Sequence, residues 1–224
     1  LGGCGYIGTI LSQYLIAKGF YVKVIDRQIY GNFIKKSQNI QIINKDVRKI
    51  SHNDFAGYDY VIHLANIAND PSVELHPSLS WDINVLATDK ICRAAIKANV
   101  KKIIFASSGS VYGIKKERNV TEDLELKPIS IYNKTKMIAE RILLSYKKEI
   151  DVVCIRPATV CGYSKRLRLD VSVNLLTHQA YKNKKIIVLG GKQIRPNIHI
   201  KDLVRIFYFS LKTFQVTHQR SVKI

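Results

Sequence analysis

The sequence predicts an α/β protein built around a doubly wound parallel β-sheet. Short apolar runs alternate along the chain with longer amphipathic stretches, and the short runs are apolar throughout. Strands of this kind belong to sheets that are covered on both faces, and alternation with helices produces right-handed crossovers between parallel strands. The chain also opens on a glycine-rich turn that leads straight into the first helical pattern. These observations place the core in a sheet with helices on both sides.

The elements come in the order that such a sheet requires. Residues 7–18 form the first helical pattern, and the apolar run YVKVID comes after it. Strands are expected at residues 21–26, 40–47, 60–65, 102–108, 152–158 and 186–190, and the other clear helices at 80–99 and 130–148. No repeat or Pro/Gly-rich linker divides the chain. We therefore place a first domain at residues 1–158 and a small, incomplete domain at 159–224, part of which returns to the first.

The composition narrows the class of protein. The 224 residues are 46% hydrophobic, so the chain can bury a sizeable core, which argues against disorder despite a net charge of +19. The four cysteines form no C-x-x-C pair, so we expect no metal site, no disulfides and a cytoplasmic location. We expect neither a membrane span of ~18 residues nor a signal peptide. The positive charge suits nucleic acid, an anionic membrane surface or a phosphorylated small molecule.

The opening glycine turn predicts a phosphate-binding loop. Glycines recur at three-residue spacing as the first helix begins, and the segment comprises Gly2, Gly5, Tyr6, Ile7 and Gly8. A turn that brings backbone against a pyrophosphate needs residues without a Cβ, and the helix N-terminus then offers free N–H groups to the phosphates. A glycine cluster alone is also compatible with a simple tight turn, so the interpretation depends on the next strand of the chain.

That strand ends on an acidic residue. Asp26 lies eighteen residues after Gly8, where a carboxylate can accept hydrogen bonds from the ribose hydroxyls of a dinucleotide. Glycines, helix and acid in this order predict a Rossmann-type domain. Asp26 favours NAD over NADP because an acid repels a 2′-phosphate. The positive charge of the neighbouring Arg27, which is also expected to contact the cofactor, argues in the other direction. Only Leu1 stands before the glycines, so we expect that the central strand of the sheet belongs to a longer chain.

A tyrosine and a lysine lie one helical turn apart at the start of the third helix. Tyr132 and Lys136 are i and i+4 and so lie on one helix face. A phenol is a poor base at neutral pH, and a nearby ammonium together with a cationic nicotinamide ring would stabilise its phenolate. Such a pair also occurs by chance on many helices. Ser108, however, directly follows a buried strand, and ligands bind at strand ends in open α/β sheets.

These motifs together resemble the extended short-chain dehydrogenase/reductase family, in particular its NAD-dependent nucleotide-sugar epimerase and dehydratase branch. The similarity covers roughly residues 2–211 and is carried by the glycine loop, by the serine four residues before Tyr112 of V-Y-G, and by Y-x-x-x-K. It implies that Asp26 binds the adenosine ribose and that Asp46 and Val47 contact adenine. The same resemblance assigns further cofactor contacts to Leu64, Ala65, Asn84 of an N-V-x-A-T stretch, and Pro157 of R-P-A.

The resemblance also implies a reaction. Tyr132 would take the proton of a sugar hydroxyl, usually at C4, as hydride passes to NAD, while Lys136 holds the nicotinamide ribose and Ser108 orients the oxygen. Asn174 and Arg195 resemble residues that bind the diphosphate of a nucleotide diphosphate sugar. A homodimer or larger homo-oligomer is expected, without nucleic acid, membrane or metal.

Three functions remain open. The dehydratases of the branch carry acid/base residues where this chain has Gly109, Ser110 and Val111, so a 4,6-dehydratase is not expected. A 4-epimerase is the first interpretation, and an oxidoreductase that makes or reduces a 4-keto sugar is the second. A truncated, non-catalytic Rossmann-fold binding protein is the third, supported by the charge alone and weakened by the intact catalytic motif of serine, tyrosine and lysine.

Overall fold

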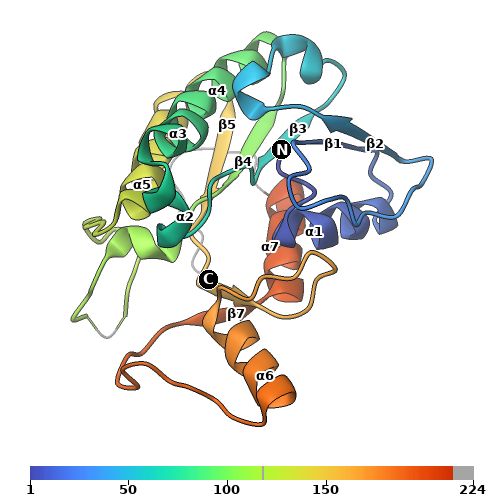
Figure 1. Cartoon of the computed structure of the whole chain (residues 1–224). Helices are drawn as coiled ribbons and strands as arrows, with labels where there is room; N and C mark the ends of the chain where they lie inside the picture. Colours follow the sequence, from blue (N-terminus) through green and yellow to red (C-terminus); the bar gives the residue numbers. More distant parts are fainter. Residues whose placement is uncertain (118, 214–224) are drawn as a thin grey trace.

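The computed structural model describes residues 1–117 and 119–213, and it confirms the doubly wound α/β fold. The strands are β1 (Val22–Asp26), β2 (Ile40–Asn44), β3 (Tyr60–His63), β4 (Lys102–Ala106), β5 (Asp151–Ile155), β6 (Thr159–Cys161) and β7 (Asn197–His199). The α-helices are α1 (Tyr6–Ala17), α2 (Asp70–Leu75), α3 (Pro77–Trp81), α4 (Ala87–Lys97), α5 (Ile131–Ser145), α6 (Ser172–Asn183) and α7 (Ile200–Thr213). Figure 1 shows α4 and α5 on one side of β3–β5, with α1 and α7 on the other.

All strand pairs in the described chain are parallel. β1 pairs with β2, and β3, β4 and β5 form a three-stranded block in that order. Residues 1 and 2 lie between the two blocks: the Leu1 nitrogen donates to Ile62 O at 2.8 Å, and Gly2 N donates to Ile25 O at 2.9 Å. Beside them, a groove of about 470 Å³ separates β1 from β3. The two hydrogen bonds hold the carboxyl ends of β1 and β3 on either side of the glycine turn.

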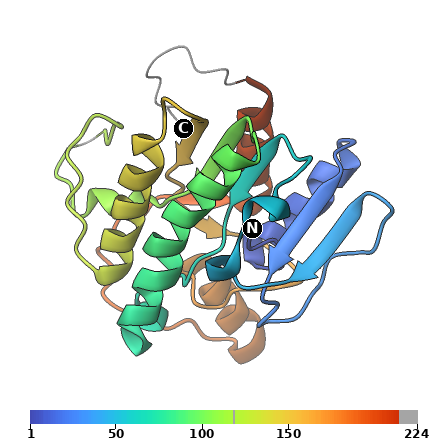
Figure 2. The same ribbon diagram turned by 90° about the horizontal axis from the view of Figure 1, so that it is seen from above.

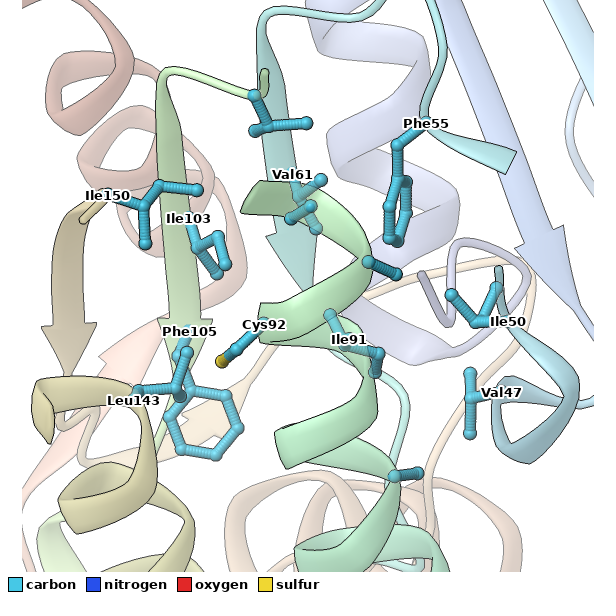
Figure 3. Packing of buried hydrophobic residues seen from close by; sticks show 14 of the residues in the cluster. Val47, Ile50, Phe55, Val61, Ile91, Cys92, Ile103, Phe105, Leu143 and Ile150 are labelled. Carbon is cyan, nitrogen blue, oxygen red and sulfur yellow. The ribbon is translucent and has the colours of Figure 1, made fainter. Parts of the chain in front are cut away.

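Side chains of β4 alternate between two cores because successive residues of a strand point to opposite faces. Ile103 and Phe105 pack with α4 and α5, whereas Ile104 and Ala106 pack with α1 and α7. Figure 3 shows the first core, in which Cys92 of α4 points toward Ile103 and Phe105, whereas Ile91 lies on the side of Val47 and Ile50. Figure 2 shows α4 and α5 covering this face of the strands. With both faces covered, the sheet accommodates strands that are apolar throughout.

The helix expected at 80–99 is interrupted. α3 ends at Trp81, a π-helical turn covers Asp82–Leu86, and α4 continues from Ala87. A π-turn inserts an extra residue into the helical repeat and is frequent at functional sites. Here it turns the buried Asn84 side chain toward the loop after β3, where Asn84 Oδ1 accepts from Ile67 N at 2.8 Å.

The prediction of a strand at residues 186–190 is wrong. This segment is irregular, and its apolar side chains are largely exposed, from 49% at Ile186 to 86% at Leu189. Within the described residues no strand pairs with it, because β7 pairs with β6 instead. An apolar run forms a buried strand only where a neighbouring strand supplies hydrogen bonds, and local sequence does not report that neighbour.

The C-terminal part leaves the sheet and then returns. β6, α6 and β7 come after β5, and α7 packs back against α1 through Leu203, Phe207 and Leu211. The division of the chain after Ala158 stays a prediction, and residues 214–224 of its second domain lie outside the described residues. No helix in the described part combines the length and apolar character needed to cross a bilayer.

Candidate active site

The glycine turn forms a cradle that side chains would fill. Gly2 has φ +76°, and a Cβ there would lie 2.5 Å from Ala65 N. A Cβ on Gly8 would lie 2.5 Å from both Gly2 O and Gly3 Cα. α1 begins at Tyr6 without a side-chain cap, so the N–H groups of its first turn are available to an anion. The backbone thus fits the pyrophosphate of a dinucleotide as the glycine spacing predicts.

Asp26 ties the end of β1 to this cradle. Its Oδ2 accepts from Cys4 N at 3.0 Å, and its Oδ1 accepts from Gln28 N at 2.6 Å. The carboxylate is held at the carboxyl end of β1, where a ribose hydroxyl can reach its remaining lone pairs. This position suits the predicted role of Asp26 in binding NAD.

Arg27 and Asp46 are brought together by the structure. Arg27 lies 3.5 Å from the Asp46 carboxylate, which also forms a 2.7 Å ion pair with Arg48. Hydrogen bonding from the Arg48 side chain lowers the pKa of Asp46, so this carboxylate is ionised at neutral pH. Val47 is buried in the core and is 7% exposed. The adenine contacts assigned to Asp46 and Val47 therefore stay predictions.

Replacing Asp26 by Ala should weaken NAD binding by about 10- to 100-fold, because hydrogen bonds to a charged group contribute roughly 1.5–3 kcal/mol. The change removes the acceptor for Cys4 N as well as the proposed ribose acceptor. Titration calorimetry with NAD checks this. The control is Asp59→Asn, a 56% exposed carboxylate just before β3, at the opposite end of the strands. Equal affinity for NAD in Asp26→Ala and wild type would contradict the assignment.

Ser108 and Tyr132 meet at the carboxyl end of β4. Ser108 caps the 3-10 turn Gly109–Tyr112, and its Oγ lies 2.8 Å from Ser110 Oγ. Burial raises the pKa of Tyr132, while the Arg168 charge and hydrogen bonding with the side chains of Asn66 and Ser108 lower it. The serine and tyrosine expected to share one substrate oxygen are therefore adjacent.

Lys136 lies one helical turn after Tyr132 on α5, and it is buried. Its Nζ donates to Ala106 O at 2.7 Å and lies 4.6 Å from the centre of the Phe105 ring. Burial lowers the pKa of Lys136 to about 7, and the Glu140 carboxylate opposes this. An amine with a pKa near neutrality changes its charge within the working range of an enzyme.

Three further residues with predicted cofactor contacts frame the same region. The Asn84 amide accepts a hydrogen bond from Ile67 N and donates one to Ile67 O. It also donates to Thr135 Oγ1 at 3.2 Å, which links the loop after β3 to α5. Pro157 O accepts from Gly109 N at 2.9 Å, which holds the segment after β5 against the Ser108 turn. Leu64 N donates to Leu1 O at 3.0 Å, which holds the end of β3 beside the glycine turn. Their contacts with a cofactor stay predictions.

A segment without a recognisable motif crosses this end of the sheet. Residues 162–170 contact the glycine loop through Gly162, whose O accepts from Tyr6 Oη at 2.6 Å. The Arg166 guanidinium lies 3.9 Å from the centre of the Tyr30 ring, in the loop after β1. Asp170 accepts a hydrogen bond from Asn69, in the loop after β3. The segment thus spans the three loops where a dinucleotide would lie.

The two predicted diphosphate-binding residues have different surroundings. Asn174 is 8% exposed, and its amide is already bonded to Gly162 N at 2.9 Å, to Arg168 O at 2.9 Å and to Tyr6 Oη at 3.1 Å. Arg195 is exposed, and its Nε donates to Gln193 at 3.1 Å. The structure brings Asn174 to the glycine loop, but it does not bring Arg195 to the other candidate residues. Both substrate assignments stay predictions.

Asn66 has no predicted site role. The sequence leaves Arg168 at least as readily a solvated loop charge as a contact to a phosphate or sugar. Both act on Tyr132, from which they are distant in the sequence. In the structure the Arg168 Nε donates to Asp170 at 3.0 Å and the Arg168 charge acts on Tyr132. In the described chain no group of three or more His, Cys, Asp or Glu residues is placed to hold a metal ion.

A phosphate cradle at the carboxyl end of a parallel sheet, with a half-buried tyrosine and a buried lysine on one helical turn beside it, defines a Rossmann-type, dinucleotide-dependent enzyme. A model of the NAD dependent epimerase/dehydratase family matches residues 1–224, and the chain belongs to that family.

Individual relatives and solved structures are similar to this chain over most of its length. A putative UDP-glucose 4-epimerase of Methanocaldococcus jannaschii is 28% identical over 91% of this chain and 70% of its own length. An uncharacterised protein of Sinorhizobium fredii is 30% identical over 85% of this chain, and the chain spans 46% of that relative. The structure of a UDP-N-acetylglucosamine 4-epimerase from Methanobrevibacter ruminantium superposes with a TM-score of 0.85 at 28% identity, covering 93% of this chain and 70% of that one.

Proposed function

We propose that the protein is an NAD-dependent nucleotide-sugar epimerase that acts at C4 of the sugar. The observation that carries the proposal is the meeting of Ser108 and Tyr132 one helical turn from the buried Lys136, beside a backbone cradle shaped for a pyrophosphate. The similarity to two 4-epimerases supports the choice of reaction. The net charge of +19 suits NAD and a nucleotide diphosphate sugar, which are both anions.

The chain's own residues would divide the work. Bound NAD supplies a hydride acceptor that can also return the hydride. Tyr132 removes the proton of the C4 hydroxyl and later returns it, and Ser108 donates a hydrogen bond that orients the same oxygen. Lys136 supplies a positive charge that favours the phenolate of Tyr132 and a donor for the nicotinamide ribose. Asp26 and the glycine cradle hold the other half of the dinucleotide.

The turn after Ser108 argues against a dehydratase. A 4,6-elimination needs a group that removes the C5 proton and one that protonates the leaving hydroxyl. Gly109, Ser110 and Val111 form the 3-10 turn next to Ser108 and provide no carboxyl group there. The buried side chain of Val111 is a hydrocarbon, so it cannot take part in proton transfer either. An epimerase needs no such group, because the hydride leaves C4 and returns to C4, and the proton leaves the C4 hydroxyl and returns to the same oxygen.

The test is a product analysis. The purified protein is incubated with NAD and, separately, with UDP-, GDP- and dTDP-hexoses, and the sugars are resolved by chromatography while absorbance follows NADH. We expect the C4 epimer without net NADH. Stoichiometric NADH or a persistent 4-keto sugar would show an oxidoreductase instead, and NAD binding without conversion of any sugar would show a non-catalytic binding protein.

A further inference from the structure

A buried ion pair lies behind the candidate catalytic side chains. Glu140 lies one turn after Lys136 on α5, and it is 1% exposed. Arg156, which directly follows β5, donates from Nε to Glu140 Oε1 at 2.9 Å and from Nη2 to Oε2 at 2.7 Å. Two parallel charge-assisted hydrogen bonds fix the orientation of both planar groups. Arg156 belongs to the R-P-A segment expected at the nicotinamide, but its side chain turns inward to α5.

The remaining face of Arg156 reaches the turn that carries Ser108. Its Nη1 donates to Tyr112 Oη at 2.8 Å, and its guanidinium lies 4.9 Å from the centre of the Tyr112 ring. Tyr112 is the last residue of the 3-10 turn that begins after Ser108. One guanidinium therefore joins the helix of Tyr132 and Lys136 to the turn of Ser108. The ion pair need not touch substrate to affect how these three side chains lie.

We propose that Glu140 and Arg156 are positioning residues for the proposed reaction: their ion pair, with Tyr112, sets Ser108 relative to Tyr132, and Glu140 sets the charge of Lys136. The proposal rests on the proposed function for its effect on turnover. Its effect on Lys136 can be measured whether or not the protein is an epimerase.

The surroundings of Lys136 single out Glu140 as its counter-ion. Glu140 faces Lys136 from α5, Cys154 faces it from β5 and His63 from β3. Burial raises the pKa of the Cys154 thiol and holds the pKa of His63 well below its usual value, so both are neutral near pH 7. β4 contributes an aromatic ring and a backbone carbonyl. Among these groups Glu140 is the anion. The Arg156 guanidinium binds the same carboxylate and competes with Lys136 for its negative charge.

The two partners should therefore shift the titration of Lys136 in opposite directions. Glu140→Gln removes the anion, which lowers the pKa of Lys136 by about one pH unit. Arg156→Met leaves Glu140 with Lys136 as its nearest cation, which raises the pKa of Lys136. A contribution to packing alone would not produce shifts of opposite sign. Glu140→Gln weakens the link between Arg156 and α5, and Arg156→Met removes the links to both α5 and Tyr112. A catalytic side chain that is misplaced by about 1 Å can lower kcat by about 100-fold.

The experiment follows the Lys136 Cε resonance by NMR of the ¹³C-lysine-labelled protein between pH 5 and 11, with the signal assigned by its loss in Lys136→Arg. The pH profile of kcat/KM is measured on the same variants. We expect the midpoint to fall in Glu140→Gln and to rise in Arg156→Met, with kcat reduced far more than KM changes. Tyr112→Phe keeps the ion pair and should leave the Lys136 titration unchanged while kcat falls several-fold.

Distinct results separate this proposal from the proposed function. If the wild type turns over no nucleotide sugar, the epimerase assignment fails, and the opposite NMR shifts still decide the role of Glu140 and Arg156. Shifts of the same sign, or none in either variant, would overturn the proposal. If Arg156→Met does not fold, Arg156→Lys takes its place: a single ammonium cannot bond Glu140 at two atoms and also Tyr112, so kcat should fall, and unchanged kcat would refute positioning.

Discussion

Replacing Tyr132 by Phe should lower turnover by about 10²- to 10⁴-fold, the range expected when a general acid/base is removed. Phe keeps the ring that packs at the start of α5 and removes the phenol oxygen that meets Ser108. The proton of the C4 hydroxyl would then have no acceptor in line with Ser108. NAD should still bind, because the glycine cradle and Asp26 lie on other loops.

The measurement is single-turnover and steady-state kinetics, together with the NAD content of the purified protein. Tyr146→Phe is the matched control, since this phenol lies at the other end of α5 and bonds Asp89 at 2.7 Å. The control should turn over at the wild-type rate. Wild-type turnover in Tyr132→Phe would remove Tyr132 from the chemistry, and loss of NAD from the variant would assign the defect to cofactor binding instead.

Much of the fold could be predicted because its signals are local. The strands expected at 21–26, 102–108 and 152–158 overlap β1, β4 and β5, and their apolar character comes from cores on both faces of the sheet. The segment at 186–190 has the same apolar character and forms no strand. The difference lies in the neighbouring strand, which periodicity within one segment does not report.

In the candidate site too, some residues have a local sequence signal and others have none. The glycines of the cradle, and Tyr132 with Lys136, occur at short fixed spacings, so local sequence places them on one turn or one helix face. Asn66, Arg168 and Arg156 act on groups that are distant in the sequence, and a single sequence contains no spacing for such contacts. Glu140 could have been noticed, because it continues the i, i+4 series of Tyr132 and Lys136 by one more turn.

Replacing Gly8 by Ala should destabilise the protein by about 2 kcal/mol, although alanine is the better helix former. Gly8 lies in the first turn of α1, and helix propensity alone predicts a gain of about 1 kcal/mol. The new Cβ, however, would lie 2.5 Å from Gly2 O and from Gly3 Cα, which are backbone atoms that cannot rotate away. Overpacking of this kind costs about 1–3 kcal/mol, or more where backbone must move.

Gly5→Ala is the matched control for this steric argument. A Cβ on Gly5 meets only Gly2 O, at 3.3 Å, and the residue has an extended conformation that alanine can adopt. Its cost should stay below about 1 kcal/mol, because the N-cap preference for Gly over Ala is the main penalty that remains. Urea unfolding gives both free energies, and calorimetry gives NAD affinity, which should be lost in Gly8→Ala as the loop moves from Ala65. A more stable Gly8→Ala would mean that helix propensity outweighs the close approach, and the turn would then not need glycine at this position.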